Sequence, residues 1–315
     1  MGFFNNIVYS AFTWLYTVLT HDYVLTIILA TLVLKMLTLP MDIKQRQSSK
    51  QMASIQPELQ RIQKKYANDP QKMQQKNAEA YKKHHINPYA SCLPLLITMP
   101  LFIMFLGGFN LMANEISVKA AIEVSQGNLQ YLDQFQWLWV NNVFRPDSGL
   151  STVVMTAKEF ETLLGKPLET LTMLSPEIKE TAKTLLENYD TLVFDPANQY
   201  VLQKAPAFLK GMLGEGGVLS NGWFLLPILS GVTMLAQNMI MQKGSPTGSA
   251  TPGMGKSMTY GFAVFSVFIC ATNTAMFGIY WITSNLAGLA VQLIFNKIYK
   301  PKEDEAVIEG EGTVK

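Results

Sequence analysis

A single lysine lies inside an apolar segment that is almost long enough to cross a lipid bilayer. The segment runs from Val24 to Leu39, contains Lys35 and holds no Asp or Glu. With Tyr23 and Met41 it approaches the roughly 20 residues that span a bilayer. A charge inside such a span is costly and usually faces a water-filled cavity. The alternative is that Lys35 extends to the headgroups near Pro40, and its position alone favours neither interpretation.

The composition is that of a membrane protein. Apolar residues make up 49% of the chain and charged residues 15%, whereas a soluble domain carries about 25% charged residues. The polar stretch 272–274 interrupts the last long apolar run. Hydropathy therefore predicts an all-α membrane protein with five transmembrane helices, at residues 23–41, 92–113, 223–241, 258–273 and 274–297.

The distribution of Lys and Arg orients these spans. Residues 42–91 are strongly basic, the loop 242–257 carries two lysines and no acid, and residues 114–222 are net acidic. Because Lys and Arg stay on the cytoplasmic side, we expect the N-terminus outside and the C-terminus inside. The first residues do not read as a cleavable signal peptide. Residues 1–22 instead predict an amphipathic helix in the outer interface, with Trp14 and Tyr16 as anchors.

The basic segment 42–91 predicts a cytoplasmic helical hairpin. An apolar stripe with alternating steps of three and four residues marks its first helix, and Pro70 can begin the returning helix after a break at Asn68. We expect its lysines and arginines on solvated faces. They either only orient the protein or also dock anionic lipids or ribosomal RNA, and charge alone favours the first. The stripe consists of Met52, Ile55, Leu59, Ile62 and Tyr66.

Two further segments lie outside the spans. Residues 114–222 form the outer segment, which includes an additional helical subdomain at about 151–217. Within it, Met155–Leu164 and Pro176–Asn188 read as amphipathic helices, the second with Ser175 as its N-cap. The tail at residues 298–315 is mixed in charge and ends acidic, which predicts disorder.

Polar residues of several spans fall at one depth. Lys35, Gln237 and Asn285 lie in the inner halves of their helices, and Thr31 lies one turn from Lys35 on the same face. Each polar residue alone is best explained as an interhelical hydrogen bond. Together with a lysine that lacks a partner, they predict a cavity open to the cytoplasm and closed on the outside.

The sequence offers little for enzymatic chemistry. None of the three histidines lies deep in a span, and Gly255-Lys256-Ser257 lacks the glycine and the strand of a phosphate-binding loop. Cys92 and Cys270 fall on separate predicted helices and read as small buried hydrophobic residues. We therefore expect no enzyme, no metal and no cofactor.

Several motifs, in order and spacing, resemble the YidC/Oxa family of membrane protein insertases from about residue 7 to residue 299. They are the run from Leu39 to Met52 followed by Gln56–Leu59, the runs Asn87–Leu96 and Met99–Phe102, Asn221–Leu229, and Gly278–Asn285.

The resemblance implies a function. Family members insert membrane proteins and help them fold, alone or with the Sec translocon, through a hydrophilic groove. Lys35 matches the basic residue of that groove, where the family usually has Arg, and Thr31, Gln237 and Trp281 match groove-lining positions; Asn285 joins them by depth. The implied partners are nascent membrane proteins, the Sec translocon, the ribosome, the signal recognition particle pathway and anionic lipids. The implied location is a bacterial cell membrane.

Two other classes stay open on the residues alone. A small anion transporter or channel would use Lys35 as a counter-charge, but it would need internal repeats, and we find none. A scaffold that only docks ribosomes would leave Lys35 unexplained. The part from about Ser151 to Gly217 does not resemble the family, and the large periplasmic β-domain of some relatives has no counterpart in this sequence.

Overall fold

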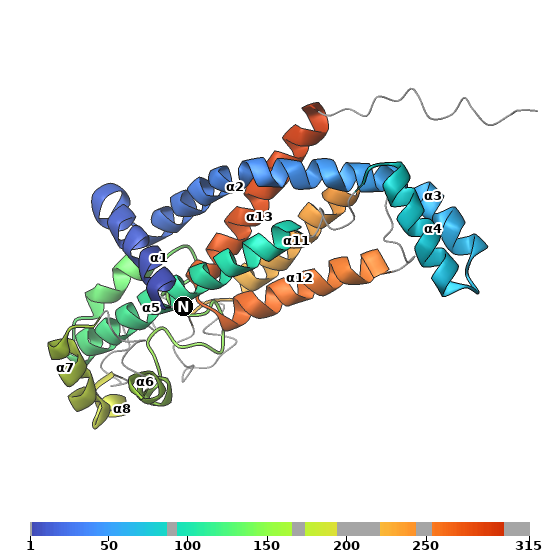
Figure 1. Ribbon diagram of the computed structural model, residues 1–315. Coiled ribbons are helices and arrows are strands. Elements are labelled where there is room, and N and C mark those ends of the chain that lie inside the picture. Colours follow the sequence, from blue (N-terminus) through green and yellow to red (C-terminus); the bar gives the residue numbers. More distant parts are fainter. Residues whose placement is uncertain (1, 87–92, 166–173, 194–220, 244–253, 299–315) are drawn as a thin grey trace, which may run out of the picture.

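The computed structural model describes residues 2–86, 93–165, 174–193, 221–243 and 254–298, which are mostly helical (Figure 1). Three helices are long and apolar enough to cross a membrane: α2 (Tyr23–Ser54), α5 (Leu93–Ser125) and α13 (Ala275–Ile298). Two shorter apolar helices, α11 (Leu225–Lys243) and α12 (Met254–Thr272), pack beside them. The predicted break between the last two apolar helices is confirmed, since α12 ends at Thr272 and α13 begins at Ala275.

Helix α2 is longer than expected. The sequence predicts a span at 23–41 and a separate hairpin after it, but α2 continues through Pro40 to Ser54. Pro40 removes one backbone hydrogen bond from α2. The packing of α2 against α13 offsets the free energy lost with that bond. The first residues of the basic segment therefore belong to the bundle. This continuation decides the geometry of the cavity described below.

Helix α5 also exceeds its predicted span, which was to end at residue 113. It continues to Ser125 because the added turns bury Val118, Ala121 and Val124 against the following elements. There α5 contacts α7 (Pro176–Leu186) and α8 (Tyr189–Val193), and α6 (Ala157–Leu164) packs on α7. The predicted cap of α7 is confirmed, since the Ser175 hydroxyl accepts a hydrogen bond from the Ile178 amide.

Helix α1 (Gly2–Leu15) packs on α5 and is followed by one π-helical turn, η1 (Tyr16–Thr20). Val8 and Phe12 are buried in this contact, and Phe12 lies 5.0 Å from Phe109 between ring centroids. A Cβ at Gly108 would come within 2.5 Å of Val8, so glycine permits the close approach. Trp14 remains 62% exposed, as suits an interfacial anchor.

The basic hairpin consists of α3 (Gln56–Lys65) and α4 (Pro70–Lys83), and Pro70 begins the returning helix as predicted. Its core is small: Ile55, Leu59 and Ala80 are buried. The hairpin and the group α6–α8 lie at opposite ends of the molecule (Figure 1). Residues 87–92, 166–173, 194–220, 244–253 and 299–315 lie outside the described residues. The predictions made for Cys92, for those parts of the subdomain at about 151–217 and for the tail therefore stay predictions.

Candidate functional site

Helix α2 carries a polar stripe along one face. Thr31, Lys35, Thr38 and Asp42 follow one another at steps of four, three and four residues, which places them in line on a helix. Both threonine hydroxyls are satisfied within the helix: Thr31 donates to the Ile27 carbonyl at 2.6 Å, and Thr38 donates to the Lys35 carbonyl at 3.2 Å. The charged side chains at Lys35 and Asp42 are therefore what this stripe presents to its surroundings.

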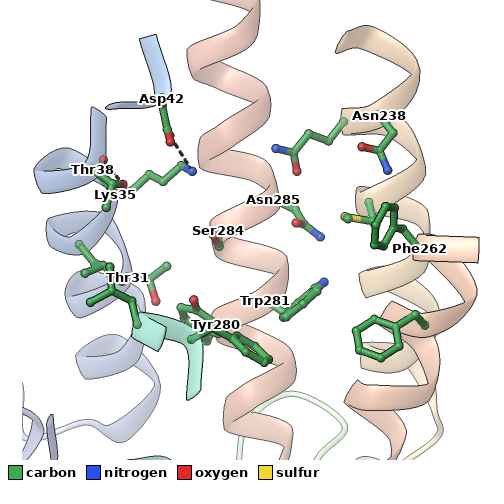
Figure 2. A pocket seen from close by; sticks show the side chains of 16 residues that line it. Thr31, Lys35, Thr38, Asp42, Asn238, Phe262, Tyr280, Trp281, Ser284 and Asn285 are labelled. Atoms are coloured by element: carbon green, nitrogen blue, oxygen red, sulfur yellow. Dashed lines mark hydrogen bonds and ion pairs between the residues drawn. The ribbon is translucent and has the colours of Figure 1, made fainter. Parts of the chain in front are cut away.

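The stripe faces a cavity of about 370 Å³ formed by all five apolar helices (Figure 2). Four of the five predicted site residues come from α2 and α13, and the fifth, Gln237, comes from α11. The structure thus brings the whole predicted set together. The lining comprises Thr31, Leu34, Lys35, Thr38, Asp42, Leu101, Phe102, Met234, Gln237, Asn238, Phe262, Phe265, Tyr280, Trp281, Ser284 and Asn285.

Lys35 is not without a partner, and this corrects the sequence-based expectation. Its Nζ lies 2.9 Å from Oδ2 of Asp42, with the two side chains 21% and 12% exposed. The two residues are seven apart, which is two helical turns on the same face. The sequence assigns Asp42 to the cytoplasmic hairpin, but α2 continues through Pro40 and keeps it in the bundle. The described lining therefore holds one positive and one negative charge.

Arg46 is a second correction. It was expected on a solvated face, yet it is only 8% exposed. One turn beyond Asp42, its Nη2 donates to the Gly288 carbonyl of α13 at 3.1 Å, while its Nη1 is buried without a hydrogen-bond partner among the described residues. Lys35, Asp42 and Arg46 together form a charge cluster with a net charge of one positive unit. The excess positive charge thus comes from the three residues combined rather than from Lys35 alone.

The other predicted site residues differ in how they are bonded. The amide nitrogen of Asn285 donates to the Thr233 hydroxyl at 3.1 Å, which is the ordinary interhelical bond considered from the sequence. Gln237 packs over Gly288, where a Cβ would come within 2.5 Å of its Nε2. The indole nitrogen of Trp281 and the amide nitrogen of Asn238 are buried without a partner among the described residues. The cavity wall therefore presents two donors that a polar ligand or water can satisfy.

An aromatic cluster closes the end of the cavity near Thr31. Tyr280 lies beside Thr31 and away from Asp42 (Figure 2). It stacks on Phe105 with ring centroids 5.6 Å apart, and Phe102 approaches Trp281 to 5.5 Å. Phe277 and Phe109 are almost fully buried beneath them. The cavity is thus polar toward the hairpin and apolar toward the opposite end.

Helix α11, which carries Gln237, is fixed at its first turn by Asp147. The Asp147 carboxylate accepts hydrogen bonds from the backbone amides of Trp223, Phe224 and Leu226 at 2.7–3.1 Å. The first amides of a helix lack acceptors within the helix itself, so the remote carboxylate caps α11. Sequence reasoning missed this cap because the residues are more than 70 positions apart.

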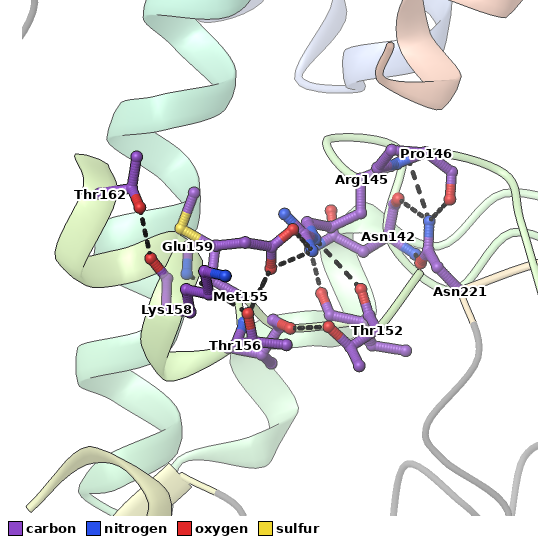
Figure 3. Close-up of polar contacts among 12 residues, drawn as sticks. Asn142, Arg145, Pro146, Thr152, Met155, Thr156, Lys158, Glu159, Thr162 and Asn221 are labelled. Carbon is purple, nitrogen blue, oxygen red and sulfur yellow. Dashed lines mark hydrogen bonds and ion pairs between the residues drawn. The ribbon is translucent and has the colours of Figure 1, made fainter. Parts of the chain in front are cut away.

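A network beside this cap holds the outer segment together (Figure 3). The Asn221 amide nitrogen donates to the carbonyls of Asn142, Arg145 and Pro146 at 2.8–3.1 Å. Arg145 in turn donates to the Glu159 carboxylate at 2.7 Å. Burial opposes ionisation of Glu159, but hydrogen bonds from Thr156 and Arg145 prevail, so its pKa lies below the ordinary value.

The family model described as 60Kd inner membrane protein matches residues 14–303. The chain belongs to this family. The resemblance to YidC/Oxa proteins seen in the sequence is thereby confirmed, and with the apolar helices it makes the chain an integral membrane protein.

Many relatives carry the name membrane protein insertase. The YidC of Clostridium tetani is 36% identical over 147 residues, which are 47% of this chain and 59% of that protein. The YidC of Wolinella succinogenes is 25% identical over 311 residues, 98% of this chain and 40% of that protein. The MisCA of Bacillus subtilis is 47% identical over 92 residues, 28% of this chain and 35% of that protein. The chain spans about half the length of several such relatives.

This family is one of insertases rather than enzymes. Among the described residues, no group of three His, Cys, Asp or Glu side chains lies close enough to hold a metal ion. What the lining can do is hold water, donate hydrogen bonds and attract an anionic group between apolar helices. These are binding and solvation functions.

Proposed function

We propose that this chain inserts membrane proteins into the bacterial cytoplasmic membrane and helps them fold. In this proposal α2, α5, α11, α12 and α13 are five spans, with the N-terminus outside and the C-terminus inside. Helices α11 and α12 have 19 residues each, which at 1.5 Å per residue is about 28 Å and close to the thickness of a hydrocarbon core. The exposed lysines of the hairpin suit the cytoplasmic side.

The observation that carries the proposal is the polar cavity between apolar helices. The apolar span of a client enters the bilayer readily, but its polar outer tail must pass through the hydrocarbon core. Each charge in that tail raises the free-energy barrier by several kcal/mol. Water and hydrogen-bond donors in the cavity shorten the apolar distance that the tail must cross. The net positive cluster around Lys35 attracts carboxylates of the tail more strongly than bulk water would allow.

The aromatic cluster at the Thr31 end supports a mechanism without an open channel. It keeps the outer half of the protein apolar, so that ions do not leak while the client waits. Helices α12 and α13 expose large hydrophobic residues such as Phe268 and Leu293. The apolar span of the client can slide along these surfaces and leave sideways into lipid, because both environments are apolar. The client leaves once its tail has crossed.

Partners follow from the same picture. The exposed basic surface of α3 and α4 is proposed to contact anionic lipid headgroups and the RNA of a translating ribosome. Its core of three buried residues makes it easy to displace, so it can move aside for a nascent chain. Clients arrive from the ribosome through the signal recognition particle pathway, or laterally from the Sec translocon.

The direct test is depletion of the protein in cells, followed by complementation. The readout is protease protection of a short single-span client with an acidic outer tail. Wild type and Lys35→Arg are expected to restore insertion, whereas Lys35→Glu is expected to abolish it because the cluster becomes net negative. Lys158→Glu, on an exposed position of α6, is the matched control and should behave as wild type. Equal insertion by Lys35→Glu and wild type would refute the proposal.

A further inference from the structure

We propose that Asp42 is a specificity-determining residue: its carboxylate occupies Lys35 until a client carboxylate displaces it. This inference rests on the proposed insertase function and deepens it. The consequence is a threshold, so that clients with acidic tails enter readily while neutral tails leave the cavity in its occupied state. Asp42 thereby acts as an internal stand-in for the acidic side chain of a client.

The geometry places the stand-in where a client would bind. Asp42 and Lys35 are the two charged members of the described lining, and their ion pair at 2.9 Å lies along α2 at the end of the lining away from Tyr280 (Figure 2). The Lys35 side chain is 21% exposed, so a carboxylate arriving in the cavity can reach it. Both side chains of the pair keep some exposure, 21% for Lys35 and 12% for Asp42, so the pair is open to exchange with an arriving carboxylate.

Arg46 provides a destination for the displaced carboxylate. It lies four residues beyond Asp42, on the neighbouring turn, where opposite charges on a helix interact. Its Nη2 is fixed by the Gly288 carbonyl, while its buried Nη1 has no hydrogen-bond partner among the described residues. A small rotation of the Asp42 side chain would exchange one cation for the other. Neither charge is then left buried without a partner, which is the costly outcome.

The exchange predicts a preference for clients with acidic tails. A client carboxylate replaces one ion pair by two, since it pairs with Lys35 while Asp42 pairs with Arg46. A neutral tail gains no such pair and must compete with Asp42 through hydrogen bonds alone. Selectivity for acidic tails therefore depends on the presence of Asp42, in addition to the charge of Lys35.

The test uses purified full-length protein in liposomes and three single-span clients that carry no, one or two acidic residues in the outer tail. For wild type, insertion should rise steeply with acid count. For Asp42→Asn, the client with one acid should insert about fivefold faster, as expected for the loss of one partly exposed competing ion pair. Asp69→Asn removes the same charge from the hairpin and keeps its helix cap, so it should match wild type.

The double variant Asp42→Asn/Arg46→Gln distinguishes the effect of occupying Lys35 from the effect of the net charge of the cluster. This double variant restores the net charge of the wild-type cluster but leaves Lys35 unoccupied, so it should behave like Asp42→Asn. If it behaves like wild type, only net charge matters and the proposal is overturned. If Asp42→Asn keeps the steep acid dependence while Lys35→Glu still abolishes insertion, the proposal fails and the insertase function stands. Loss of any effect of Lys35→Glu would instead refute the proposed function.

A measurement on the wild-type protein keeps the proposal testable if Asp42→Asn does not fold. Lysine side chains are labelled with ¹⁵N, and the Lys35 Nζ signal is assigned by its loss in Lys35→Arg. A peptide with an acidic tail should shift this signal, and the matched peptide with a neutral tail should not. An unmoved signal with both peptides would overturn the exchange.

Discussion

The ion pair between Lys35 and Asp42 predicts a measurable coupling in stability. At 2.9 Å and an effective dielectric constant of about 20, two unit charges attract by roughly 6 kcal/mol. Desolvation of both groups and immobilisation of the lysine offset most of this gain. With side chains 21% and 12% exposed, the pair lies between surface pairs, worth about 0–1 kcal/mol, and buried pairs, which cost about 3–5 kcal/mol to break. We expect a coupling of about 2 kcal/mol.

The assay is a double-mutant cycle of Lys35→Ala, Asp42→Ala and the double variant, unfolded reversibly in mixed micelles and followed by circular dichroism. Asp42→Ala should destabilise more than Lys35→Ala, because it leaves Lys35 and Arg46 without a counter-ion, whereas Asp42 without Lys35 still has Arg46. Lys183 and Glu180 pair at 2.8 Å on exposed positions of α7 and form the control cycle, with a coupling of at most about 0.5 kcal/mol. A coupling below that value for Lys35 and Asp42 would refute the reasoning.

Two predictions concern the segment that anchors α11. Asp147→Ala should lower the free energy of unfolding by about 3 kcal/mol in the same assay, because three backbone amides lose a charged acceptor; a loss under about 1 kcal/mol would contradict the capping role. Glu159→Gln should be less stable than wild type at neutral pH. Because the folded pKa of Glu159 is lowered, its contribution is complete above about pH 5 and is lost as pH falls through that pKa. Thermal melts of both proteins should therefore converge in acid, and a constant difference would contradict this.

The apolar helices could be predicted because hydropathy and charge leave few other solutions in a membrane. The five site residues could also be predicted as a group, because their shared depth and the family motifs agree. Whether these residues receive a client stays a prediction. The starts of α4 at Pro70 and of α7 after Ser175 could be predicted from short motifs, because a helix cap depends on neighbours within one turn.

What could not be predicted depends on tertiary support. The sequence prediction ends the first span at residue 41, directly after Pro40, and so places Asp42 and Arg46 outside the bundle. The signal was present, since the steps from Thr31 through Lys35 to Asp42 continue the same helical face across the proline. The Asp147 cap had no comparable local signal. The accepting carboxylate and the donating amides are more than 70 positions apart and meet only in the folded chain.

The central claim is that the cavity around Lys35 holds the outer tail of a client during insertion. The most direct measurement is site-specific photo-crosslinking of a stalled nascent client in membranes. A photoreactive residue in place of Gln237 or Thr31, which line the cavity, should crosslink to the acidic tail. The same residue in place of Leu293, which is 52% exposed on α13, should not crosslink to that tail. Tail crosslinks at Leu293 with none at Gln237 or Thr31 would contradict the account.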